Sequence, residues 1–398
     1  MAETGFSEAI IADLEARMMQ FVSDKEVEGI STLLVHKGEE VSRKVFGKLR
    51  VRDDAPIQRD SIYRIYSMTK PVTGVAMMML FEEGKFSLDD PITRFVPQFE
   101  KLKVLSPPHN PSPNNLKDPD HIPTMRELLS HTAGFGYGLW GEDYTNAQFR
   151  EMKIMDSEDM ESFIEKVASV PLLNQPGAEW FYSCAVDIQG YIVEQITGEK
   201  FSSFLQKRIF DPLDMVDTGF YVPEAKLDRF GELFAYVPQL GGLAPLNKTR
   251  YAYRKETVRM ESGGGGLVGT IDDYANFCQM LLNGGEFNGH KLISPESIQL
   301  MRTNLLEPHM EMGTTGTIDT VDASGRGFGL NFGVITEPEK TGIAYGKDTY
   351  FWGGAAGTWF WIDPVNELFF IGMIQRMGAP QDFREDSARL VYKALNTK

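Results

Sequence analysis

The sequence has 398 residues, of which 42% are hydrophobic, and a formal net charge of −16 at pH 7. This length allows a large core and two or more lobes. The acidic balance argues against nucleic acid and against an anionic membrane as partners, because both require a basic surface. The two cysteines, Cys184 and Cys278, lie far apart and lack the spacing of a zinc site or a disulfide framework, so neither feature is expected.

The start of the chain gives an expectation about location. Residues 1–10 are acidic and lack the basic segment followed by an apolar stretch that is typical of a secretion signal. The longest apolar runs of the chain are too short to span a bilayer. Free thiols fit a reducing compartment. The sequence therefore predicts a cytoplasmic protein.

The N-terminal third begins with a helix and a hairpin. Apolar residues at helical spacing predict an amphipathic helix over 6–22, and two β-rich runs at 31–36 and 41–45, separated by a Lys37-Gly38 turn, predict a hairpin. A second helix is expected from Ser67 to about residue 81, because apolar side chains recur there at helical spacing and Pro71 fits only a first turn.

That second helix carries the first catalytic signal, Ser67-Met68-Thr69-Lys70. Residues three apart lie on the same side of a helix, so Ser67 and Lys70 are neighbours. The N-terminal end of a helix disfavours a lysine cation, which leaves Lys70 able to accept a proton as the neutral amine. A serine beside such a base becomes a nucleophile without a histidine. Because a single Ser-x-x-Lys also arises by chance, its context must decide.

The remaining elements suggest two lobes. Residues 86–320 contain helical stretches, long loops and few strand signals, and the proline-rich stretch 99–123 is expected to be an irregular loop, either a surface linker or a lining of the cleft. Strands at 358–362 and 368–374 predict a second hairpin, and a helix is expected over 381–396. We predict an antiparallel sheet flanked by the terminal helices, formed by 1–85 and 321–398, an inserted mostly helical lobe at 86–320, and an active site between them.

Three further segments carry candidate chemistry. Tyr182 follows a Pro-Gly turn and precedes a helical run, where its hydroxyl can exchange a proton with Ser67 if Lys70 is close, although most tyrosines only pack. The small residues of Gly353-Gly354-Ala355 allow a close approach, so the Ala355 and Ser67 N–H groups are candidates for an oxyanion hole; a bulge is the alternative. The glycine-rich run 261–270 lacks the features of a phosphate loop and is expected to form a wall of the cleft.

Together these motifs resemble the serine hydrolases of the class C β-lactamase and penicillin-binding type. The resemblance covers nearly the whole chain and rests on the order of Ser67-Met68-Thr69-Lys70, the segment 124–135, Tyr182-Ser183-Cys184, the glycine-rich run to Asp272-Asp273-Tyr274, and Trp352-Gly353-Gly354. It implies an α/β (α+β) fold of the β-lactamase type. Within that group the chain is most similar to the family VIII carboxylesterases, which carry Trp-Gly-Gly where β-lactamases carry Lys-Thr-Gly.

Two departures from the β-lactamase pattern bear on the substrate. Cys184 stands in the place of the Asn of Tyr-x-Asn, and Trp352 and Gly353 replace the Lys and Thr that would anchor a β-lactam carboxylate. Without that pairing an acidic group is left uncompensated, so a neutral ester suits Trp352, Gly353 and Gly354 better. The chain also lacks Gly-x-Ser-x-Gly, which argues against an α/β-hydrolase, and His131 is expected to be structural rather than a base.

The resulting hypothesis is a carboxylesterase that forms an acyl-enzyme on Ser67, with Lys70 and Tyr182 moving its proton and with no metal or organic cofactor. Its expected partner is a small-molecule ester. The alternatives are a β-lactamase or D-amino-acid peptidase, an acyltransferase of the statin-synthase type that uses the same serine, and, more remotely, a catalytically silent binding protein on the same fold.

Overall fold

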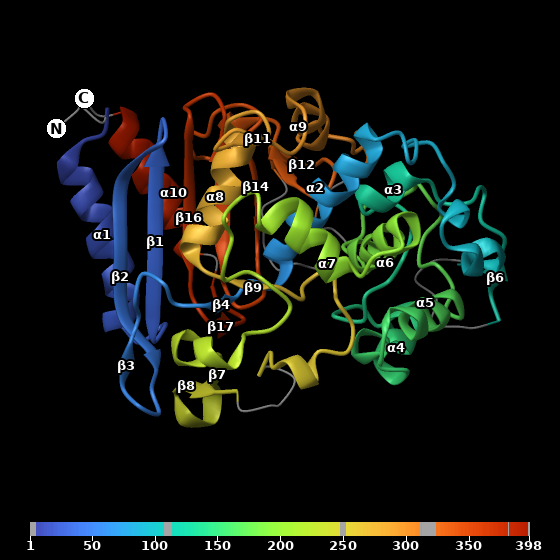
Figure 1. The fold of residues 1–398 in the computed structure, drawn as a ribbon, viewed down its shortest axis with the longest axis horizontal. Coiled ribbons are helices and arrows are strands. Elements are labelled where there is room, and N and C mark those ends of the chain that lie inside the picture. The colour runs from blue at the N-terminus through green and yellow to red at the C-terminus, as the bar shows by residue number, and fades with distance from the viewer. Residues whose placement is uncertain are drawn as a thin grey trace.

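The structure is a computed structural model that describes residues 5–106, 114–246, 252–310, 312, 324–380 and 382–396. Its centre is an eight-stranded sheet in which every neighbouring pair is antiparallel (Figure 1). The strand order is β12 (Arg326–Phe328), β13 (Gly333–Ile335), β14 (Tyr350–Gly353), β15 (Trp359–Asp363), β16 (Leu368–Met373), β1 (Gly29–His36), β2 (Glu39–Arg50) and β3 (Ala55–Pro56).

The two ends of the chain meet inside this sheet, as predicted. β1 pairs with β16 in a register that runs from Ser31 opposite Met373 to His36 opposite Leu368. The burial of all six residues of β16 shows that this junction is central, not an edge. The expected N-terminal and C-terminal hairpins are therefore the β1–β2 and β15–β16 pairs of one sheet.

One face of the sheet is covered by the terminal helices α1 (Glu8–Ser23) and α10 (Asp382–Asn396), which pack against each other (Figure 1). A separate apolar cluster fills this layer. The α1 side chains Leu14, Met18 and Phe21 and the α10 side chains Phe383 and Val391 belong to it. The helical spacing in the sequence thus identified the core-facing side of both helices, and the fold class predicted from the sequence is confirmed.

The opposite face of the sheet carries the larger core, which includes α2 (Thr69–Glu82), α8 (Ile271–Leu282) and the helical region beyond them. The remaining helices are α3 (Met125–Leu129), α4 (Tyr144–Glu151), α5 (Met160–Ala168), α6 (Ala185–Thr197), α7 (Phe201–Leu205) and α9 (Pro295–Met301). All but two residues of α2 are buried, which fits a helix that lies between the sheet and the other helices.

Among the described residues, the strands outside the eight-stranded sheet are all short. They are β4 (Tyr63–Arg64), β5 (Val104–Leu105), β6 (Leu116–Lys117), β7 (Phe234–Val237), β8 (Gly242–Pro245), β9 (Val268–Gly269), β10 (Glu286–Phe287), β11 (His290–Lys291) and β17 (Arg376–Met377). They form small sheets of two or three strands, one of which joins β17 to β7 and β8. Part of the proline-rich stretch, residues 107–113, lies outside the described residues, as does residue 381, the expected start of the last helix.

The proposed division into lobes stays a prediction, and its boundary at residues 320 and 321 lies outside the described residues. One helix of the middle segment belongs with the sheet: α8 packs against β16, β15 and β1. Its buried apolar side chains explain this position, since Ile271, Phe277 and Leu281 need an apolar partner on the sheet face. The helices α3 to α7 lie on the far side of α2 from the sheet, in the right half of Figure 1.

Candidate active site

Ser67 lies in a single turn of 3-10 helix, Tyr66–Met68, that runs directly into α2. Ser67 is only partly buried, whereas Lys70, one turn later, is 0% exposed. Pro71 is the third residue of α2, in the first turn, where its missing N–H removes no hydrogen bond of the helix. Tyr66 has a φ of 43°, a left-handed conformation that is unfavourable for an aromatic residue. Strained backbone of this kind is concentrated at functional sites.

The structure brings the three predicted catalytic side chains together. The Ser67 Oγ lies 3.2 Å from the Lys70 Nζ and 2.6 Å from the Tyr182 hydroxyl, which comes from a loop 115 residues away in sequence. The Lys70 Nζ also lies 4.5 Å from the centre of the Tyr182 ring. The Ser67 hydroxyl is therefore within reach of a direct proton transfer to or from both Lys70 and Tyr182.

Two further groups hold the Lys70 amine. It donates to the Gly264 carbonyl at 2.6 Å, and it lies 3.3 Å from the Tyr137 hydroxyl. Burial raises the pKa of Tyr137 well above its usual range, so this hydroxyl remains protonated. The contacts with Gly264, Tyr137 and Ser67 therefore fix the position of the Lys70 nitrogen beside the Ser67 hydroxyl.

Aromatic rings enclose Tyr182, which is 3% exposed. Trp140 stacks on it with an interplanar angle of 9° and a centroid distance of 5.8 Å, and Trp352 lies at 5.6 Å. His131 contacts the same ring at 5.1 Å. These contacts fix the direction of the tyrosine hydroxyl and remove water from around it, which strengthens the electrostatic interactions of the site.

The small residues after β14 lie against the backbone that leads to Ser67. A Cβ built on Gly354 would be 2.3 Å from the Ile65 carbonyl oxygen, so a larger residue would push the two segments apart. Gly353 has a similar contact with the Arg384 guanidinium of α10. Ala355 is exposed, and its N–H makes no hydrogen bond to any described residue. This segment therefore contains one backbone donor without a partner among the described residues.

His131 and Cys184 are buried and not arranged as reactive groups. Burial lowers the pKa of His131 well below its usual range, so the imidazole is neutral. Its Nδ1 accepts a hydrogen bond from the Ser183 N–H at 3.2 Å, which ties the loop before α6. Burial also raises the pKa of the Cys184 thiol well above its usual range. The structural role expected for His131 agrees with these contacts.

Sequence reasoning did not identify Gly264, Tyr137 and Trp140 as part of the site. The glycine-rich run 261–270 does form a wall beside α2, but its contribution of a carbonyl to Lys70 carries no side-chain signal. Tyr137 lies two residues after the segment 124–135 used for the resemblance. That position was the available clue, since a tyrosine two residues beyond a matched motif is a natural neighbour of the same site.

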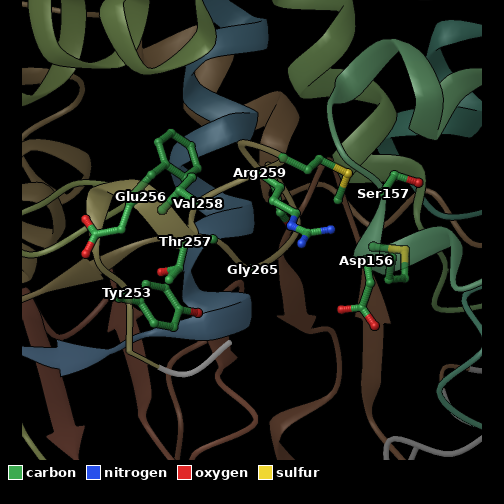
Figure 2. A pocket seen from close by; sticks show the side chains of 13 residues that line it. Asp156, Ser157, Tyr253, Glu256, Thr257, Val258, Arg259 and Gly265 are labelled. Carbon is green, nitrogen blue, oxygen red and sulfur yellow. The ribbon is translucent and has the colours of Figure 1, made fainter. Parts of the chain in front are cut away.

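A cavity of about 510 Å³ is lined in part by the glycine-rich run (Figure 2). Ser67 is not among its lining residues; the cavity reaches the site at Gly265, on which a built Cβ would lie 3.8 Å from the Tyr66 carbonyl carbon. Figure 2 shows the Arg259 side chain in the middle of the cavity, between Glu256 on one side and Asp156 on the other. Arg259 makes no ion pair with any residue that the structure describes.

The described residues contain no group of three or more histidine, cysteine, aspartate or glutamate side chains placed to hold a metal ion. None of the described helices is long and apolar enough to cross a membrane.

Known proteins resemble the chain over most of its length. Protein Rv1367c of Mycobacterium tuberculosis is 35% identical over 80% of this chain and 79% of its own, and a lovastatin esterase of Penicillium rubens is 31% identical over 80% and 81%. Esterase EstB of Burkholderia gladioli is 26% identical over 88% and 87%. Among solved structures, EstCE1, described as a hydrolase with promiscuous acyltransferase activity, has a TM-score of 0.78 at 21% identity, over 97% of this chain and 99% of its own.

The match to the Beta-lactamase family extends over residues 11–394, from the first helix to the last. It includes every segment that the geometry brings to Ser67: the start of α2, the loop before α6, the glycine-rich run and the turn after β14. The chain therefore belongs to the Beta-lactamase family.

Proposed function

We propose that the protein is a serine carboxylesterase of the family VIII type that acts through an acyl-enzyme on Ser67. The observation that carries this proposal is the placement of one serine hydroxyl 3.2 Å from a buried lysine amine and 2.6 Å from a buried tyrosine hydroxyl. Relatives named as esterases over more than three quarters of the chain support the choice of an ester as substrate.

In the acylation step the Ser67 oxygen bonds to the ester carbonyl carbon while its proton passes to the Lys70 amine. The carbonyl electron pair moves onto the oxygen, which the N–H groups of Ser67 and Ala355 would stabilise; loss of one such donor typically costs about 10²–10³ in rate. Collapse of this intermediate breaks the bond to the alcohol. The alcohol takes a proton from Tyr182, and Lys70 returns its proton to Tyr182.

Deacylation follows the same path in reverse. A water oxygen bonds to the acyl carbon, the water proton passes through Tyr182 to Lys70, and the Ser67 oxygen leaves with a proton. These groups supply every proton that the cycle moves, so we propose no metal and no organic cofactor.

The substrate we propose is a small ester that is neutral around the reacting carbonyl. Trp352 is 6% exposed and packs on Tyr182, where a β-lactamase would present a cation. The cavity in Figure 2 is large enough for an acyl or alcohol group of moderate size. We also keep the prediction of a cytoplasmic location, because both cysteines are free thiols.

The test is hydrolysis of p-nitrophenyl butyrate beside a chromogenic cephalosporin, with the wild type, Ser67→Ala and Ser31→Ala. Ser31 is a matched control, because its hydroxyl lies 2.6 Å from a buried tyrosine hydroxyl, that of Tyr63. We expect ester turnover in the wild type and Ser31→Ala but not in Ser67→Ala, and little cephalosporin opening. Fast cephalosporin opening with poor ester turnover would reassign the protein as a β-lactamase, and turnover that survives in Ser67→Ala would remove the nucleophile assignment.

A second candidate is acyl transfer to an alcohol other than water, favoured by the structural likeness to EstCE1 and its described acyltransferase activity. The two activities share the acyl-enzyme and differ only in what attacks it. Adding increasing methanol to the butyrate assay and measuring methyl butyrate against butyrate separates them. A ratio of methyl butyrate to butyrate above the molar ratio of methanol to water would favour acyl transfer. A product ratio equal to the molar ratio of methanol to water would favour hydrolysis as the activity.

A further inference from the structure

Gly264 uses both of its backbone polar groups at the site. Its carbonyl accepts the Lys70 Nζ at 2.6 Å, and its N–H donates to the Asp187 Oδ1 at 3.1 Å. One residue of the glycine-rich run, Gly264, therefore joins the lysine to a carboxylate through its two backbone polar groups. Asp187 plays no part in the proton transfers proposed above.

The Asp187 carboxylate is buried, with 0% of the residue exposed, and it is the third residue of α6. Its Oδ1 also accepts the Ser262 hydroxyl, whereas its Oδ2 has no hydrogen-bond partner among the described residues. Burial raises the pKa of Asp187. A buried carboxylate oxygen without a hydrogen bond lowers the stability of the fold, so we expect a role of Asp187 other than stabilisation.

The glycine-rich run fits closely between α6 and α2. A Cβ on Gly264 would lie 2.5 Å from the Asp187 Oδ2, and one on Gly263 would lie 2.5 Å from the Val186 carbonyl oxygen. On the α2 side, the Thr73 hydroxyl donates to the Gly263 carbonyl at 2.8 Å. At Gly263 and Gly264 the run therefore leaves no room for a side chain against α6, and hydrogen bonds hold it from both sides.

We propose that Asp187 is a positioning residue that holds the Gly264 carbonyl where it directs the Lys70 amine at Ser67. Because Tyr182 lies five residues before Asp187, the same carboxylate also fixes the start of α6, and with it Tyr182, relative to Lys70. The inference rests on the proposed function of Ser67, Lys70 and Tyr182, and adds a residue that acts through them.

The experiment compares Asp187→Ala, Asp187→Asn and Ser262→Ala, with Asp273→Ala as the control. Asp273 is also a buried third residue of a helix, and it also accepts one hydroxyl and one backbone N–H, but far from Lys70 in the chain. For each variant we would measure kcat and KM on p-nitrophenyl butyrate, the melting temperature, and the rate at which a fluorophosphonate labels Ser67.

We expect Asp187→Ala to lower kcat and the labelling rate by about 10²-fold with KM little changed, since a misplaced reacting group costs about that much. Asp187→Asn should restore most of the kcat, because the amide oxygen can accept both hydrogen bonds. Ser262→Ala should lower kcat several-fold. Asp273→Ala should lower the melting temperature and leave kcat unchanged per folded molecule.

Two results would overturn the proposal. The first is a wild-type kcat in folded Asp187→Ala or, if that variant does not fold, in Ser262→Ala. The second is an Asp187→Asn variant as slow as a folded Asp187→Ala, which would assign the effect to the charge of residue 187 instead of to its position. Failure of the proposed esterase function can be distinguished from failure of the Asp187 proposal. If the protein is not an esterase, the wild type shows no ester turnover, but the rate of Ser67 labelling in the Asp187 variants still measures the effect of Asp187 on Ser67.

Discussion

The first turns of α6 and α8 have the same local hydrogen-bonding arrangement but contact different parts of the molecule. In each helix the third residue is a buried aspartate, Asp187 or Asp273, that accepts one side-chain hydroxyl and one backbone N–H from a distant segment. Burial raises the pKa of both carboxyl groups. In each case a glycine lies so close that a Cβ would crowd the contact. The same local device therefore occurs twice in one chain.

The difference lies in what each carboxylate holds. The partners of Asp273 are the Asp217 N–H and the Thr218 hydroxyl, and the helix also has a capping residue, Thr270, whose hydroxyl accepts the Asp273 N–H at 3.1 Å. At α6 the capping position is occupied by Cys184, which makes no such bond. A missing cap typically costs about 1 kcal/mol. The start of α6 lacks this cap, and its carboxylate is linked to Lys70 through Gly264.

The largest effect that separates the two regions should come from their tyrosines. Removing the Tyr182 hydroxyl takes away the proton donor to the leaving alcohol, so Tyr182→Phe should lower kcat by about 10²–10⁴ with little change in melting temperature. Tyr274, in α8, donates to the Met68 carbonyl at 2.9 Å, so Tyr274→Phe should cost about 1 kcal/mol of stability and little rate. Ester kinetics and urea unfolding of both variants test this contrast. Equal rate losses in the two would contradict it.

The glycines give the next effect. A Cβ on Gly264 would lie 2.5 Å from the Asp187 Oδ2, and one on Gly269 would lie 2.8 Å from the Thr218 hydroxyl oxygen. Gly264→Ala should lower kcat by roughly 10–10²-fold, because the displaced carbonyl moves the Lys70 amine. Gly269→Ala should cost about 1–3 kcal/mol of stability through overpacking and leave the rate per folded molecule intact. A Gly264→Ala enzyme with wild-type kcat would show that the glycine-rich run 261–270 can accommodate the added Cβ without moving Lys70.

These contrasts show what the sequence can and cannot predict. Ser67 and Lys70 are three residues apart on a helix, so their contact follows from helical geometry alone. Tyr182 came from the order of several motifs, and the antiparallel sheet came from the alternation and turns of two hairpins. Each of these predictions depends on the types of side chain in the sequence or on their spacing.

The contacts that the sequence missed are made by backbone groups or by long-range packing. Nothing in the glycine-rich run distinguishes Gly264, whose carbonyl binds Lys70, from its neighbours. The local patterns at α6 and α8 do not say which buried aspartate lies beside the lysine. The position of α8 on the sheet was likewise not predicted, because its helical period shows that one face is buried but not against which element.

The variant expected to change activity least removes the ionisation of Asp273. Its expected effect is on the pH dependence of the free energy of unfolding. Burial raises the pKa of this carboxyl group to about 6, above its usual value of 3.8. The folded protein therefore holds the proton more tightly than the unfolded chain does. The stability that this group contributes is greatest below about pH 4, and it is lost as the pH rises through about 6.

Asp273→Asn removes this titration and retains an oxygen that can accept from Thr218. The free energy of unfolding of the wild type, minus that of Asp273→Asn, should fall by up to about 3 kcal/mol between pH 4 and pH 7 and then stay level. Taking the difference cancels the other titrating groups, which both proteins share. Urea unfolding of both proteins at pH 4, 5, 6 and 7 measures it, with kcat at pH 7 as the second readout. A flat difference would mean that the Asp273 carboxyl is not protonated on folding, whereas a lower kcat in the variant would show that the start of α8 is coupled to the active site after all.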